Sequence, residues 1–130
     1  MRFAGDTVAR MLGKRLPAGP VDGLRAFLAL WREILTSTDF QAGCPVLAVS
    51  IEDSSDEAVR TTAAEAFTGW EKQLTDSLRE HGADEAEQLA TLVVAAAEGA
   101  VAMCRARRST QPLDHVGAQL EKLITAAVGE

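Results

Sequence analysis

The stretch 38-TDFQAGCPVLAVSIE-52 decides the fold, because it separates two long amphipathic segments of an otherwise helical sequence. Within it, Gly43-Cys44-Pro45 interrupts the helical periodicity, and the short apolar run 46–49 follows at once. The β-branched residues of that run are typical of a buried strand. A strand needs a partner, however, and no second run of this character occurs in the sequence. We therefore predict that Cys44 to Ile51 forms a short, fully buried helix, with Pro45 in its first turn.

Five long helices are predicted around this short one, so the expected fold class is all-α. The first runs from about Ala4 to Leu16 and stops at the prolines and glycine of 17–20, and the second runs from Pro20 to about Thr38 with apolar residues spaced i, i+3, i+4, i+7. We expect the third to open at Ser54, where Ser54-Ser55-Asp56-Glu57 has the pattern of a capping box. It should end at Gly82, because glycine readily adopts the left-handed conformation at a helix C-terminus.

The last two long helices are marked by charge and by proline. Asp84 is predicted to cap the fourth helix, and Arg105, Arg107 and Arg108 close it, where positive charge is favoured by the helix dipole. These arginines could also form a phosphate site, but complementing the helix end is the simpler interpretation. Pro112 is then expected to start the last helix.

The composition is that of one globular domain with an acidic surface. The chain has 130 residues, 47% of them hydrophobic, and a net charge of −6. A surface of that sign repels phosphate backbones, which argues against nucleic-acid binding by this chain alone. Cys44 and Cys104 suggest reduced, buried thiols of a cytoplasmic protein, although a disulfide between them stays open. The apolar segment from Leu89 to Cys104 is too short to span a bilayer and carries Glu98, so no membrane association is expected.

Catalysis and metal binding have little support in the sequence. Cys44 near a helix start could be activated by a histidine, but His81 lies at a helix end beside Gly82 and His115 in a first turn. The cysteines and histidines lack metal-ligand spacing, and no nucleophile elbow, phosphate loop or dinucleotide motif occurs. We therefore predict a non-enzymatic protein with no catalytic residues, no metal and no cofactor.

Several motifs, in order, resemble one family. F-x-x-GCPV-x-A at residues 40–48 follows a helix that contains ALWREIL, and F-x-x-W at 67–70, LREHGA at 78–83 and AAEGAVAMCRARRSTQPL at 96–113 come after it. Together they resemble the C-terminal effector domain of TetR-type regulators of the LmrA/YxaF-like branch, over nearly the whole chain. The helix-turn-helix domain with which such regulators begin has no counterpart in these residues.

The resemblance implies both a fold and a mechanism. Residues 1–130 would be a single ligand-binding and dimerisation domain of a transcriptional repressor, without the DNA-binding domain. A small hydrophobic effector would enter a pocket among the helices and tilt the first helix. We expect this effector to be planar and aromatic. The full-length protein would then leave its operator DNA, provided that the ligand prefers the released conformation. The alternative is a stand-alone dimeric helical module that binds a ligand or a partner and has no DNA function.

The last two long helices are the expected homodimer interface. The fourth is rich in small residues, and Gly99 inside it costs up to about 1 kcal/mol relative to alanine, so a packing reason is expected. Close helix packing within one monomer is the alternative, but the resembled family dimerises through the matching pair. The predicted interface residues are Leu92, Ala96, Gly99, Ala100, Val116, Leu120, Leu123 and Ile124.

The effector pocket is expected among the first three long helices and the segment after Gly43. Aromatic residues recur there one helical turn apart, which is typical of core packing and also of ligand cavities between helices. Glu98 has no ionic partner at helical spacing, so it is either a structural contact, within the chain or across the dimer, or a polar anchor for a ligand. The predicted lining residues are Phe27, Leu30, Trp31, Cys44, Phe67, Trp70, Leu74 and Met103.

Overall fold

The computed structural model of the chain describes residues 2–51 and 56–129, with side chains over 5–48 and 56–129. The described residues form helices and no strand, which confirms the all-α prediction. In chain order the elements are α1 (Arg2–Arg15), the short 3-10 helix η1 (Leu16–Ala18), α2 (Pro20–Ser37), α3 (Pro45–Ile51), α4 (Glu57–Glu80), α5 (Ala86–Arg107) and α6 (Gln111–Ala127).

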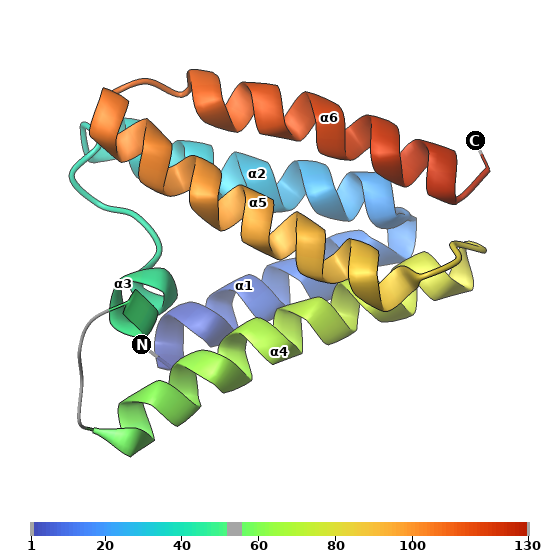
Figure 1. The fold of residues 1–130 in the computed structure, drawn as a ribbon, viewed down its shortest axis with the longest axis horizontal. Coiled ribbons are helices and arrows are strands. Elements are labelled where there is room, and N and C mark those ends of the chain that lie inside the picture. Colours follow the sequence, from blue (N-terminus) through green and yellow to red (C-terminus); the bar gives the residue numbers. More distant parts are fainter. Residues whose placement is uncertain (1, 52–55, 130) are drawn as a thin grey trace.

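The long helices pack as a bundle with α5 near its middle (Figure 1). Helix α5 contacts α4, α6 and α2, while α1 packs on α4 and α2. Helix α3 lies at the end of the bundle where α4 begins, and the two chain ends lie at opposite ends of the molecule (Figure 1). This arrangement leaves one side of α5 and α6 uncovered by the other described helices.

The short segment after Gly43 is helical, as predicted, but it is not fully buried. Val46 and the preceding Cys44 are buried, whereas Pro45 and Ala48 are exposed. The reason is that α3 packs on α4 and α1 with one face only, at the end of the bundle.

Two predicted helix caps are wrong. Helix α4 begins after Asp56, whose carboxylate accepts hydrogen bonds from the backbone N–H groups of Ala58 and Val59 at 3.0 and 3.4 Å. Asp56 thus takes the capping role that the capping-box pattern assigned to Ser54, and Ser54 lies outside the described residues.

At the start of α5, Glu85 rather than Asp84 precedes the first helical residue, in a left-handed conformation (φ 53°) and without a side-chain cap. Asp84 therefore does not cap α5 as predicted. Gly82 does have a positive φ of 89°, as its predicted role at the end of α4 requires.

An aromatic cluster forms the centre of the core. Phe27 and Trp31 of α2 meet Trp70 of α4, with ring centroids 5.7 to 6.2 Å apart. Phe67 adds a fourth ring, 5.6 Å from Trp70 in an edge-to-face arrangement. The indole N–H of Trp70 donates to the carbonyl oxygen of Gly5 at 3.1 Å, so the cluster also fixes α1.

The arginines at the end of α5 hold the loop between α2 and α3. Arg105 donates to the carbonyl oxygen of Gln41 at 2.8 Å, and Arg108 pairs with Asp39 at 2.7 Å. Arg108 also lies 5.9 Å from the ring centroid of Phe40. Two of the three arginines therefore bind this chain itself, a role that the sequence did not predict.

Helix α5 is longer than the predicted apolar segment. It spans 22 residues and by length and composition alone could cross a membrane, which is weak evidence, because core helices of soluble proteins have the same character. In this bundle α5 packs against three other helices and carries the buried Glu98.

Candidate ligand-binding groove

A groove of about 450 Å³ opens between α3, α4 and α5. It forms because α5 presents the small side chains of Ala95 and Gly99 beside Phe67 of α4, so that the two helices do not fill the space between them. Most of the lining is apolar. The lining residues are Leu47 from α3, Phe67 and Glu71 from α4, and Thr91, Val94, Ala95, Glu98 and Gly99 from α5.

Glu98 is the unusual member of this lining. It is only 4% exposed, and neither of its carboxylate oxygens accepts a hydrogen bond of normal geometry from the described residues. Burial raises the pKa of Glu98 to about 7, because the charged form loses its hydration. An unpaired carboxylate in such surroundings costs stability unless it is protonated or finds a partner.

The thiol of Cys44 lies beside this carboxylate. Burial, together with the charge of Glu98, raises the pKa of Cys44 to about 12, so the thiol stays protonated. As a weak donor toward the carboxylate, it offsets only part of the effect of burial on the pKa of Glu98. A thiol with so high a pKa is a poor nucleophile, which argues against the catalytic role considered for Cys44. Cys44 and Cys104 are both buried and free.

The structure brings only part of the predicted pocket together. Phe67 lines the groove, and Cys44 lies beside Glu98 at its buried side. Leu30 is half-buried and packs against the core, whereas Met103 is 44% exposed on the surface of α5. The remaining four predicted lining residues are fully buried in the core, most of them in contact with one another: Phe27, Trp31, Trp70 and Leu74.

Most of the groove residues on α5 were not predicted from the sequence to line a pocket. Thr91, Ala95 and Glu98 follow i, i+4, i+7 spacing, so small or polar residues recur on one side of an otherwise apolar helix. This pattern of small or polar residues around a lone carboxylate is the feature of the sequence that could have indicated the groove. Of the two interpretations of Glu98, the structural contact within the chain is limited among the described residues to the weak donor Cys44.

Comparisons with known proteins agree with this architecture. The family model described as transcriptional regulator LmrA/YxaF-like, C-terminal domain, matches residues 20–119. The chain belongs to this family of TetR-type regulators. It is 35% identical to the HTH-type transcriptional regulator Rv0196 of Mycobacterium tuberculosis (strain ATCC 25618 / H37Rv), over 98% of this chain and 69% of that protein.

Two Bacillus subtilis (strain 168) proteins are also similar to this TetR-type domain. The HTH-type transcriptional regulator LmrA is 28% identical over 81% of the chain and 57% of its own length, and YxaF is 27% identical over 94% and 66%. No solved structure matches. The family and its named members are transcriptional regulators, so this TetR-type domain is not an enzyme.

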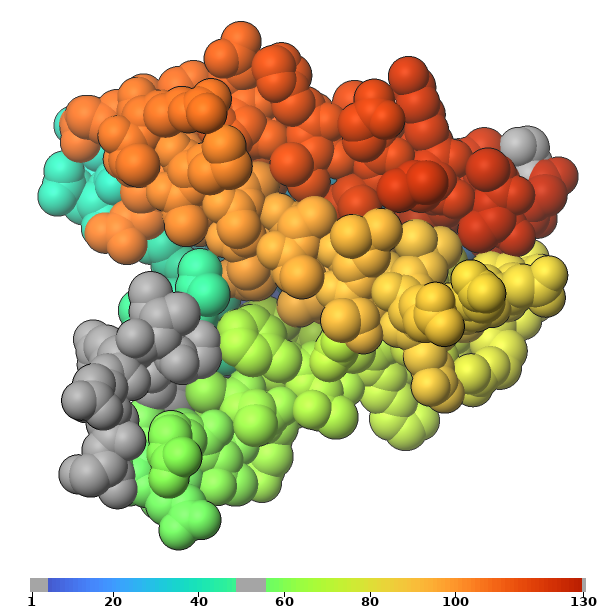
Figure 2. Space-filling view, viewed as in Figure 1, coloured from blue at the N-terminus to red at the C-terminus, as the bar shows by residue number. Residues whose placement is uncertain are grey.

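The predicted dimer residues fall into two groups. In the first group, Leu92 (46%) and Leu123 (47%) are strongly exposed on α5 and α6. Met103 of α5, which was predicted to line the pocket, is the third large apolar side chain that is strongly exposed (44%) among the described residues. Figure 2 shows α5 and α6 next to each other on one face of the TetR-type domain. Ala96 and Val116 on these helices are half-buried.

The second group is inside the domain. Ala100, Leu120 and Ile124 are buried, because they lie where α5 and α6 pack on the rest of the bundle, and they contact this chain's own core. Gly99, in contrast, belongs to the first group: it is exposed, and a Cβ added there would meet nothing within 4 Å among the described residues. Packing among the described residues therefore supplies no reason for a glycine in the middle of α5.

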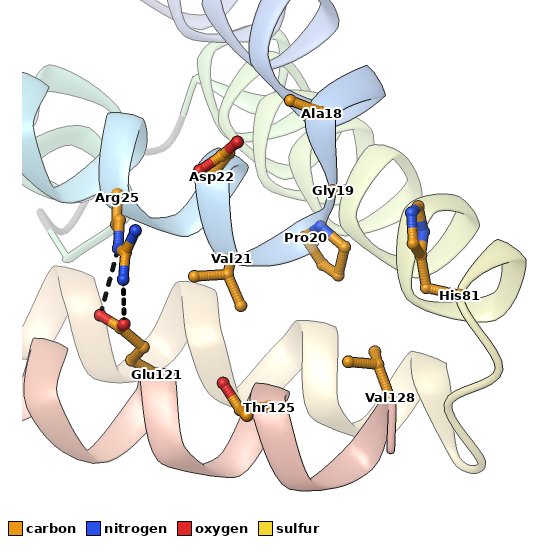
Figure 3. A pocket seen from close by; sticks show the side chains of 10 residues that line it. All are labelled: Ala18, Gly19, Pro20, Val21, Asp22, Arg25, His81, Glu121, Thr125 and Val128. Carbon is orange, nitrogen blue, oxygen red and sulfur yellow. Dashed lines mark hydrogen bonds and ion pairs between the residues drawn. The ribbon is translucent and has the colours of Figure 1, made fainter. Parts of the chain in front are cut away.

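A second hollow, of about 380 Å³, lies between the start of α2, the end of α4 and α6 (Figure 3). Arg25 and Glu121 form an ion pair across it, and His81 lies at its far side with Nδ1 2.8 Å from the carbonyl oxygen of Ser77. Because its main charged groups are already paired with each other, this hollow offers a ligand less than the groove at Glu98.

Proposed function

We propose that this chain is the effector-binding and dimerisation domain of a TetR-like repressor that acts in the bacterial cytoplasm. A small hydrophobic molecule binds in the groove between α3, α4 and α5 and thereby releases the full-length regulator from its operator DNA. The observation that carries the proposal is the groove itself, a mostly apolar hollow with a buried carboxylate in its wall that accepts no hydrogen bond of normal geometry from the described residues.

The contacts of Phe67 offer a route from this groove to α1. Phe67 packs against Trp70, and Trp70 donates its indole hydrogen bond to the backbone of Gly5 in α1. A Cβ at Gly5 would lie 3.0 Å from that of Ala66, so α1 and α4 are in close contact. A ligand that displaces Phe67 therefore shifts the position of α1 relative to α4. In a full-length regulator, α1 is the helix that leads to the DNA-binding domain.

We further propose that two copies associate through α5 and α6. The exposed apolar side chains Leu92, Met103 and Leu123 would be covered in such a dimer, and Gly99 would allow the partner to approach closely. A two-fold arrangement of these two helices is a four-helix bundle.

The effector proposal is tested by tryptophan fluorescence with a panel of planar aromatic compounds. Trp70 touches Phe67, so we expect saturable quenching by some compounds. Ala95→Phe fills the groove and should abolish that response, while Ala64→Phe, an exposed alanine of α4 outside the groove, should keep it. Equal responses of the two variants would mean that the ligand binds elsewhere, and no response from any compound would reject the sensing role.

The dimer proposal is tested by analytical ultracentrifugation of the purified chain. We expect a dimer that dissociates in the double variant Leu92→Glu, Leu123→Glu. The control Ala64→Glu adds a charge at an exposed position of α4 and should leave the mass of the dimer unchanged. A monomeric wild-type chain would reject the proposed interface, and so would a double variant that stays dimeric.

A further inference from the structure

Among the described residues, the groove at Glu98 is lined by acids and by no base. Glu71 and Glu98 are its charged lining residues, on opposite sides from α4 and α5. A neighbouring hollow that shares Glu71 and Thr91 does contain basic side chains. These are already paired, Lys72 with Asp76 at 2.9 Å and Arg79 with Glu87 at 3.1 Å. The local charge therefore favours a cationic occupant and disfavours an anionic one.

The position of the Glu98 carboxylate adds a specific requirement. Its oxygens are out of contact with solvent, and the neighbouring thiol of Cys44 is a weak donor. A positively charged N–H group would supply the charge-assisted hydrogen bonds that the described residues do not provide. Because these oxygens have no contact with solvent, direct contact with a ligand requires the Glu98 side chain to turn toward the groove.

The apolar part of the lining defines the rest of the ligand. Phe67 is half-buried and offers an aromatic face or edge, while Val94 and Ala95 line the groove on α5. An aromatic ring system would pack against these side chains, with the small residues Ala95 and Gly99 leaving room for it.

We propose that the groove is selective for lipophilic amines that are protonated at neutral pH, with Glu98 as the direct partner of the ammonium group. This inference rests on the proposed function, because it names the ligand class of the same groove. Glu71 contributes a second negative charge at the opposite wall. Neutral and anionic molecules with the same ring system bind more weakly.

The test is isothermal titration calorimetry on the purified chain with three probes of the same ring system. They are 1-naphthylmethylamine, which is cationic at neutral pH, 1-naphthalenemethanol, which is neutral, and 1-naphthoic acid, which is anionic. In the wild type we expect the amine to bind at least about tenfold more tightly than the alcohol, and the acid most weakly. In Glu98→Gln, the dissociation constants of the amine and the alcohol should lie within about twofold of each other.

Glu33→Gln is the matched control, because it removes the same charge from an exposed position of α2 outside the groove. It should keep the preference for the amine. If Glu98→Gln retains that preference, or if wild type binds the alcohol as tightly as the amine, the inference is overturned. Alcohol binding that Ala95→Phe abolishes would still support an apolar effector site and leave the proposed function standing. Failure of the amine to bind at all would overturn the inference, and the fluorescence panel would then decide separately on the sensing role.

Discussion

The aromatic cluster and the groove at Glu98 are neighbours that share Phe67, yet they are built in opposite ways. In the cluster, rings from α2 and α4 lie 5.6 to 6.2 Å apart and fill the space between the helices. In the groove, Ala95 and Gly99 leave space open beside a buried carboxylate. The difference shows that in this bundle large side chains fill the space between helices, whereas small side chains next to a large one leave it open.

The largest expected effect separates the two regions by their packing. Phe27→Ala removes a fully buried ring of the cluster, and we expect it to lower the free energy of unfolding by about 3–5 kcal/mol. Leu47→Ala, at a half-buried position of the groove, should cost about 1 kcal/mol or less, since less apolar surface is lost there. Urea denaturation monitored by circular dichroism measures both. Equal losses would mean that the groove is packed as tightly as the core.

The second prediction concerns the pH dependence of stability at Glu98. The fold raises its pKa from the usual 4.5 to about 7, so the folded state binds the proton more tightly than the unfolded state does. The contribution of Glu98 to stability is therefore highest below pH 4.5 and falls as the pH rises to 7 and above. The full change corresponds to about 3 kcal/mol.

Glu98→Gln removes this titration. We expect its stability relative to wild type to rise between about pH 4.5 and pH 8, and Glu33→Gln to show no such trend. Urea unfolding at a series of pH values measures the difference. A constant difference between Glu98→Gln and wild type would show that Glu98 is hydrated or paired in solution.

A smaller effect tests the link between the cluster and α1. Trp70→Phe keeps an aromatic ring but loses the hydrogen bond to the Gly5 carbonyl oxygen. We expect a loss of about 1–2 kcal/mol in unfolding free energy, of which the hydrogen bond accounts for about 1 kcal/mol. Hydrogen exchange should rise at the amides of α1 more than at those of α6. Uniform acceleration across the bundle would contradict a specific role in holding α1.

The smallest expected effect is a gain in stability. In Gly99→Ala the added Cβ meets open space within the chain, and alanine favours the helix, so folding of the monomer should gain up to about 1 kcal/mol. The same methyl group should weaken a dimer in which the partner approaches Gly99. Dilution series in the ultracentrifuge separate the two effects. A dimer that is tighter in Gly99→Ala would place the partner away from this residue.

Much of the fold followed from local patterns. Apolar periodicity and the breaks at Pro17, Gly43 and Gly82 placed the helices, since these residues act on the backbone of their own segment. The caps at Ser54 and Asp84 failed because several polar residues compete at each helix start, and the turn geometry chose Asp56 and left Glu85 without a side-chain cap.

The candidate site followed less well from the sequence. The aromatic residues were predicted to line a pocket, but most of them pack against one another, because rings on neighbouring helices meet in the core. Glu98 was recognised as unusual from its apolar neighbours, since that observation needs only helical spacing. The residues that face it across the groove, Leu47 and Glu71, come from other helices and could not be found in this way.

The sequence by itself determined that this protein is an all-α domain of the TetR-type family with a carboxylate in an apolar helix, because periodicity, helix breakers and family motifs are properties of short segments. Only the tertiary structure decided which aromatic rings fill the core, which apolar residues remain exposed, and where space is left beside Glu98. The physical reason is that a groove is the volume that side chains from several helices fail to fill. That volume depends on how the helices are rotated and spaced, which no single segment encodes.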